Sequence, residues 1–173
     1  IPGMRDVMPE QSKEGERTST GDMQISDFNA FYRWNSGHLL ENRTRGAFAE
    51  WLVHRALNIN SEFREEWAPV DATYKGITIE IKSAAYEQSW PQERPSSIVF
   101  SMRQKVSDVY VFCLMRGKSP EDLDHWDFWV VPTEALPNQH SISLNPLKEL
   151  FGDPVPFTEL KPLIEAQCAG ATR

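Results

Sequence analysis

The chain has 173 residues, of which 40% are hydrophobic, so it is long and apolar enough for one compact domain. Its net charge of -7 disfavours nonspecific binding to phosphate backbones, although a local groove can carry the opposite sign. No apolar run approaches the ~18 residues that span a bilayer, so we expect no membrane partner. The sequence shows no secretory-signal pattern, and Cys113 and Cys168 belong to no CxxC pair, so we expect a reduced, cytoplasmic setting.

The N-terminal part is predicted to contain a polar tail followed by two helices. Because residues 8–22 hold almost no large apolar side chains, we expect a tail over residues 1–25 and a single domain over 26–173. Ser26 or Asp27 is the expected cap of a first, aromatic-rich helix that ends near Gly37. The second helix is expected to begin at residue 39 or 45 and to end at 57. Its apolar side chains recur on one side at helical spacing: Ala49, Leu52, Val53, Ala56 and Leu57.

Strand patterns dominate the middle of the chain. Residues 67–74 and 77–82 are predicted to form a hairpin around Lys75-Gly76, because the second segment alternates apolar and polar side chains. The segment 108–115 is almost entirely apolar, which is typical of a central strand buried on both faces. The remaining expected elements are a helical turn or loop at 83–90, strands at 98–102 and 125–131, and short helices at 147–151 and 160–166. This order predicts an α/β or α+β domain with a mixed central sheet flanked by helices.

The predicted hairpin places acidic side chains next to each other. Counting outward from a two-residue loop at Lys75-Gly76 sets Asp71 directly opposite Glu80. Lys82 lies two residues beyond Glu80 and therefore shares its face of the strand. Two facing carboxylates normally destabilise a hairpin, and a divalent cation between them removes the conflict. The pattern therefore indicates a metal site.

Glu50 is the third candidate acid. It lies at the edge of the apolar stripe of the second helix, one turn before His54, so its carboxylate can extend over the sheet. Carboxylates from Glu50, Asp71 and Glu80 are ligands suited to Mg²⁺ or Mn²⁺. A simpler interpretation is that Glu80 and Lys82 form an ordinary solvated strand face, Asp71 caps a turn, and Glu50 is a surface acid.

Other polar and aromatic residues carry weaker patterns. The segment 88–118 holds five basic residues against two acidic ones, so it is locally basic in an acidic chain. Candidate phosphate contacts in it are Gln88, Arg103, Gln104 and Lys105. His54 and His125 are expected to be packing or surface residues, because no HxH or HxxxH pair exists. Core or edge packing, rather than base stacking, is expected for Trp67, Trp90, Trp126 and Trp129.

These residues together resemble the PD-(D/E)XK, or restriction-endonuclease-like, nuclease superfamily. The matching pieces are Glu50 in GAFAEWLVHRAL, Asp71 in APVD, and Glu80 to Lys82 in GITIEIKS, followed by the strands DVYVFCLM and HWDFWVVP. The resemblance covers about residues 40–135. One departure is that Val70 separates Pro69 from Asp71, so the literal Pro-Asp pair is absent.

The resemblance implies a restriction-endonuclease-like core of four mixed strands flanked by helices, and an endonuclease that cleaves DNA, or RNA, with Mg²⁺ or Mn²⁺. Asp71 and Glu80 would bind the metal together with the backbone carbonyl of Ile81. Lys82 would orient or activate the attacking water, and Glu50 would hold a second cation or its water.

Two other functions remain open at the level of the sequence. One is a nucleic-acid-binding or assembly subunit with a weakened site on the same fold, which the acidic net charge favours. The other is a protein–protein interaction domain without a nucleic-acid role. Cleavage of both strands of a duplex with one site per chain would favour a homodimer.

Overall fold

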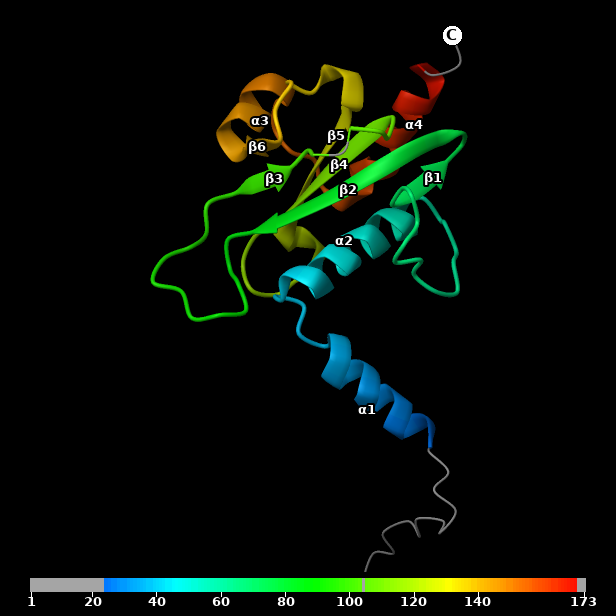
Figure 1. The fold of residues 1–173 in the computed structure, drawn as a ribbon, viewed down its shortest axis with the longest axis vertical. Helices are drawn as coiled ribbons and strands as arrows, with labels where there is room; N and C mark the ends of the chain where they lie inside the picture. The colour runs from blue at the N-terminus through cyan, green and yellow to red at the C-terminus, as the bar shows by residue number, and fades with distance from the viewer. Residues whose placement is uncertain (1–23, 104, 171–173) are drawn as a thin grey trace, which may run out of the picture.

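The computed structural model describes residues 24–103 and 105–170 (Figure 1). Its first helix, α1 (Ile25–Ser36), is capped by Gln24, whose backbone N–H donates to the Asp27 carboxylate at 2.9 Å. The expected cap was therefore misplaced, and Asp27 completes a capping box instead. The helix ends before Gly37, as predicted, and none of its residues is buried. The predicted tail falls almost entirely on residues 1–23, which lie outside the described residues.

The second helix, α2 (Asn42–Ala56), confirms the predicted amphipathic pattern. Ala49, Leu52 and Val53 are buried, and Leu57, which caps the helix, is buried with them. These side chains pack against the central sheet, and the opposite side of the helix remains at the surface. The packing holds Glu50 at the boundary between the two sides, directly after the buried Ala49.

A mixed four-stranded sheet with the order β1-β2-β4-β5 forms the centre of the fold. The β1–β2 and β4–β5 pairs are antiparallel, whereas β2 and β4 run parallel. Every residue of β4 is buried between its two neighbours, which confirms the predicted central strand. The strands are β1 (Ala72–Tyr74), β2 (Ile77–Ala85), β4 (Val109–Met115) and β5 (Trp126–Pro132).

The β1–β2 hairpin has the predicted two-residue loop. Lys75 and Gly76 both have positive φ, at 45° and 83°, as a type I′ turn requires, and Tyr74 pairs with Ile77. The first strand is much shorter than expected, because its pairing stops at Ala72 and the residues from 67 to 71 form a turn and bends. Pro69 has no N–H for a ladder hydrogen bond, which is consistent with the late start.

The second strand is longer than expected. Ser83 to Ala85, predicted as a turn or loop, continue β2, because each pairs with a residue of β4 on the other side. The predicted strand at 98–102 exists as β3 (Val99–Ser101), but it pairs with β6 (Ser141–Ser143) in a separate two-stranded sheet. The two short helices predicted near the C-terminus are present and longer, as α3 (Leu144–Phe151) and α4 (Leu160–Gly170).

The central sheet separates two apolar clusters. On one face, Ile77, Ile79 and Ile81 pack with α2 and α4. The other face packs with β3, β6 and α3. Because side chains alternate along β2, Glu80 and Lys82 project from this second face, beside their partners Tyr110 and Phe112. The two charged residues therefore lie on the side of the sheet opposite to α2.

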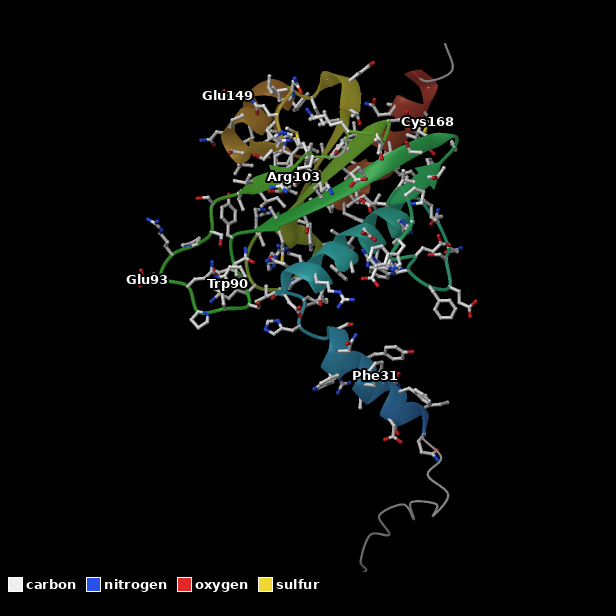
Figure 2. All side chains as sticks on the ribbon, viewed as in Figure 1. Phe31, Trp90, Glu93, Arg103, Glu149 and Cys168 are labelled. Atoms are coloured by element: carbon white, nitrogen blue, oxygen red, sulfur yellow. The ribbon has the colours of Figure 1, made fainter. Side chains whose placement is uncertain are left out.

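The four tryptophans that were expected to pack differ in their exposure. Trp126 and Trp129 are buried, as expected, and Trp90 is half-buried at 50% exposure, but Trp67 is 93% exposed, so the packing predicted for Trp67 is wrong. Figure 2 shows Trp90 and Glu93 on the loop that projects between β2 and β3, and Phe31 on α1. No helix in the described parts of the chain is both long and apolar enough to cross a bilayer.

Candidate metal centre

Asp71 lies immediately before β1, at the point where the edge of β2 becomes free. Its carboxylate Oδ2 accepts the backbone N–H of Ile81 at 2.7 Å. Since the β1–β2 ladder stops at the Ala72–Ile79 pair, the carboxylate replaces a backbone acceptor that a longer strand would supply. The backbone carbonyl of Asp71 in turn accepts a hydrogen bond from Nε2 of His54 at 2.8 Å, so both the side chain and the backbone of Asp71 are held.

Glu80 approaches this edge from the face of the sheet opposite to α2. Its Oε1 lies 2.8 Å from Nζ of Lys82, and its side chain is only 10% exposed. Burial, followed by the negative charges of Glu80 and Asp71, raises the pKa of the nearby Tyr110 to about 12. Glu80 and Lys82 are thus a partly buried ion pair rather than a freely solvated strand face.

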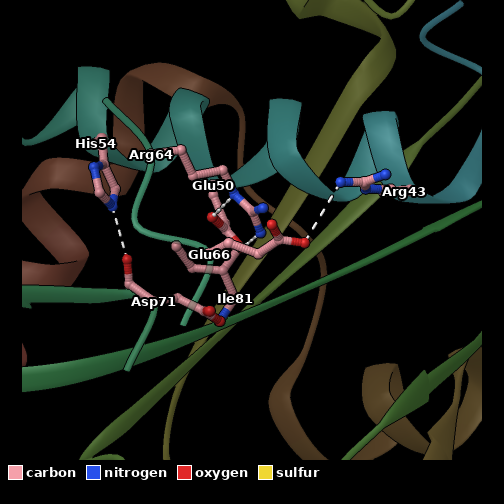
Figure 3. Close-up of polar contacts among 7 residues, drawn as sticks. All are labelled: Arg43, Glu50, His54, Arg64, Glu66, Asp71 and Ile81. Carbon is pink, nitrogen blue, oxygen red and sulfur yellow. Dashed lines mark hydrogen bonds and ion pairs between the residues drawn. The ribbon is translucent and has the colours of Figure 1, made fainter. Parts of the chain in front are cut away.

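Glu50 approaches the edge from α2. Both of its carboxylate oxygens accept hydrogen bonds from Arg64, each at 2.7 Å, in a bidentate pair (Figure 3). The Glu50 side chain is 17% exposed, so it does not point into bulk solvent. It is also close enough to Asp71 for its charge to act on that carboxyl group.

The negative charges of Glu50 and Glu80 both act on the carboxyl group of Asp71. Burial raises the pKa of Asp71 to about 6, and the charges of Glu80 and Glu50 contribute to the increase. The Ile81 N–H and the charge of Lys82 oppose the change without cancelling it. Three acids against two bases leave an excess negative charge in this partly buried cluster, which a further cation would neutralise.

A cavity of about 520 Å³ opens beside the cluster, between α2 and the segment that leads to β1. Its polar lining includes Glu50, His54, Arg64 and Asp71, while Trp51 and Phe63 supply aromatic surface. Glu80 and Lys82 do not line it. At its rim, Arg43 and Glu66 form a weaker ion pair of 3.5 Å between two exposed side chains (Figure 3).

The chemistry of these donors fits a hard divalent cation, because they are carboxylate oxygens with an unneutralised charge. Within residues 24–103 and 105–170, however, no three His, Cys, Asp or Glu side chains are already grouped to hold a metal ion. Two of the three acids are instead engaged by cationic side chains, Glu50 by Arg64 and Glu80 by Lys82. The site therefore contains carboxylates suited to a divalent cation, but the side chains of Arg64 and Lys82 already pair with two of them.

The other predicted contacts lie away from this cluster. Gln88 accepts from Arg45 and donates to the carbonyl of Ala85, and Lys105 donates to the carbonyl of Pro137 at 2.6 Å. Arg103 is exposed after β3, and Gln104 lies outside the described residues. None of the described three lines the cavity. His125 contacts the carbonyl of Ser119, in agreement with the expected packing role.

Two residues of the cluster were not recognised from the sequence. His54 was expected to be a packing or surface residue, yet it holds the backbone of Asp71; its position four residues after Glu50 was the available signal. Arg64 was not singled out at all. It is the only basic residue between Asn58 and Asp71, in a segment that contains three glutamates. That isolated positive charge was the signal for an internal ion pair.

Comparison with known proteins finds no family model and no curated protein that matches this sequence.

Proposed function

We propose that the chain is a divalent-metal-dependent nuclease that hydrolyses phosphodiester bonds of DNA, or of RNA, on a restriction-endonuclease-like core. The observation that carries the proposal is the Asp71 carboxylate, held on the Ile81 N–H at the free edge of β2 and acted on by the charges of Glu80 and Glu50, with Lys82 paired to Glu80. A chance set of surface acids would not be expected to include a carboxylate that is held by a backbone amide and whose pKa is raised by burial and then by two other acids.

Each residue has a distinct role in this proposal. Asp71 and Glu80, with the backbone carbonyl of Ile81, would hold Mg²⁺ or Mn²⁺, and Glu50 would support the cation from the α2 side. A bound divalent cation neutralises the phosphate and lowers the pKa of water. Lys82 supplies a positive charge to orient the attacking water and to stabilise the phosphate oxygens. His54 is a positioning residue, because it acts only through the backbone of Asp71.

The proposal is tested with plasmid, linear duplex and single-stranded DNA, and with RNA, in the presence of Mg²⁺, Mn²⁺ or a chelator. We expect cleavage with metal, none with the chelator, and loss of activity in Asp71→Asn and Lys82→Ala. Lys148→Ala is the matched control, because this lysine is exposed on α3. Activity that survives both site variants would refute the proposal.

A second candidate is a nucleic-acid-binding or assembly subunit with a weak site. The observation in its favour is that Glu50 and Glu80 are already paired with Arg64 and Lys82. In that case the ion pairs are structural and no cation is required. Binding of nucleic acid that is equally strong with metal and with chelator, without cleavage of any substrate, would favour this candidate.

A further inference from the structure

The ion pair between Arg64 and Glu50 is bidentate and joins the segment after α2 to the helix itself. Both Nε and an Nη of the guanidinium donate, so the planar fork of Arg64 engages both oxygens of one carboxylate. Arg64 is 45% exposed whereas Glu50 is 17% exposed, so the arginine reaches inward from the surface to the acid. The hydrogen bond with Glu50 first, and then the charges of Glu50, Asp71 and Glu66, raise the pKa of Arg64, so several acids around the cavity stabilise the charged guanidinium.

Arg64 belongs to a long segment that is held at its two ends by hydrogen bonds of Ile59 and Asp71 and has few side-chain ties between them. Residues 58–71 connect α2 to β1 and form no helix or strand. Segments of this length without regular structure are commonly functional. The other ion pair between this segment and α2, Glu66 with Arg43, is longer and has both side chains more than half exposed. Arg64 is therefore the principal side-chain anchor that holds the segment over Glu50.

We infer that Arg64 is an internal counter-ion of the proposed metal centre, which a divalent cation must displace from Glu50 in order to bind there. The inference rests on the proposed function, because it takes Glu50 as a metal-supporting acid. A divalent cation on the Glu50 carboxylate would meet the positive guanidinium at hydrogen-bond distance, and like charges at that separation repel strongly in a partly buried site. The two cations therefore compete for one carboxylate.

Displacement of Arg64 has a structural consequence. Once the guanidinium leaves Glu50, the middle of the segment 58–71 keeps only the exposed Arg43–Glu66 ion pair to α2, while its two ends stay bonded to His54 through Ile59 and Asp71. The same segment forms one wall of the 520 Å³ cavity that contains Glu50 and Asp71. Metal binding and opening of this wall are thus coupled, and by linkage a variant that frees Glu50 binds metal more tightly.

The experiment measures the affinity of the full chain for Mn²⁺ by titration calorimetry. We expect Arg64→Ala to bind Mn²⁺ about tenfold more tightly than the parent, as loss of a charge-assisted competitor implies. Arg43→Ala is the matched control, because it removes the same charge beside the same segment without touching Glu50, and its affinity should stay within about twofold. In a Glu50→Gln background, adding Arg64→Ala should change the affinity by less than about twofold.

Several results overturn the inference: affinity in Arg64→Ala that equals or falls below the parent value, the same gain with and without Glu50, or no binding of Mn²⁺ by either protein. If Arg64→Ala does not fold, hydrogen exchange on the parent decides. Amides in residues 60–70 should exchange faster with Mn²⁺ than with chelator, and unchanged or slower exchange refutes displacement.

The outcome is separable from that of the proposed function. Tighter binding in Arg64→Ala without cleavage by any variant supports the competition and refutes the nuclease. Cleavage by the parent with unchanged affinity in Arg64→Ala supports the nuclease and refutes the competition.

Discussion

Replacement of Asp71 by Asn tests whether the carboxylate cluster is electrostatically strained without a metal. The substitution removes the negative charge while leaving a side-chain oxygen that can still accept the Ile81 N–H. Asp71 has its pKa raised from the ordinary value of 3.8 to about 6, mainly by burial and then by Glu80 and Glu50. The native state therefore binds this proton more tightly than the unfolded state does.

The sign and the size of the effect follow from this difference in pKa. The free energy of unfolding falls as the pH rises from 3.8 to about 6, and the full cost of the charged carboxylate is present above that window. Each pKa unit corresponds to about 1.4 kcal/mol, so the difference converts to about 3 kcal/mol before solvent screening. Partial access of solvent reduces this to roughly 1–2 kcal/mol. A chain of this size would then gain about 2–8 °C in Tm.

Thermal unfolding in chelator is the assay, at pH 8 and at pH 4. We expect Asp71→Asn to be more stable than the parent at pH 8 and equal to it at pH 4. Asp71→Ala is the control, because it also removes the charge but leaves the Ile81 N–H without its acceptor, at a cost of about 1–3 kcal/mol. A loss of stability in Asp71→Asn at pH 8, or an equal gain at both pH values, would refute the electrostatic reasoning.

Three further predictions concern other parts of the cluster and hairpin. Lys82→Ala should bind Mn²⁺ at least as tightly as the parent but cleave at least about 100-fold more slowly, and cleavage at the parental rate would remove Lys82 from the mechanism. His54→Ala should lower the free energy of unfolding by about 1 kcal/mol and weaken Mn²⁺ binding, whereas the exposed His140→Ala should change neither. In chemical denaturation, Gly76→Ala should lower the free energy of unfolding by about 1 kcal/mol, because φ is +83° there. Gly46→Ala in α2, where an added Cβ meets nothing within 4 Å, should raise it by up to about 1 kcal/mol. Changes of the same sign in the two variants would contradict the backbone argument.

Local patterns in the sequence determined much of the sheet. The run of apolar residues in β4 predicted a central buried strand, because such a strand needs no polar alternation. The Lys75-Gly76 dipeptide predicted a two-residue turn, and this turn sets the register that brings Asp71 to the level of Glu80. These features depend on neighbours in the chain, so they can be inferred without the tertiary structure.

The limits of β1 and the composition of the site depended on long-range contacts. A strand starting at Trp67 was expected because the segment leads into the Lys75-Gly76 turn, but Pro69 and the ties of Arg64 and His54 to other elements hold this segment off the sheet. Likewise, Ser83 to Ala85 remain in β2 because β4 pairs with them, and β4 lies more than 20 residues further along the chain. The strand propensity of the residues does not by itself predict such pairings.

The sequence by itself therefore determined which acids could meet, through the period of a strand and the length of a turn. Only the tertiary structure decided how each acid is held. Asp71 lies at the edge of β2 on the amide of Ile81, Glu50 extends from α2 on one side of the sheet, and Glu80 projects from the other side. It also decided that Arg64, from an irregular segment without periodicity, neutralises Glu50. Irregular segments are positioned by the contacts they make in the folded chain, so their partners cannot be read from local spacing.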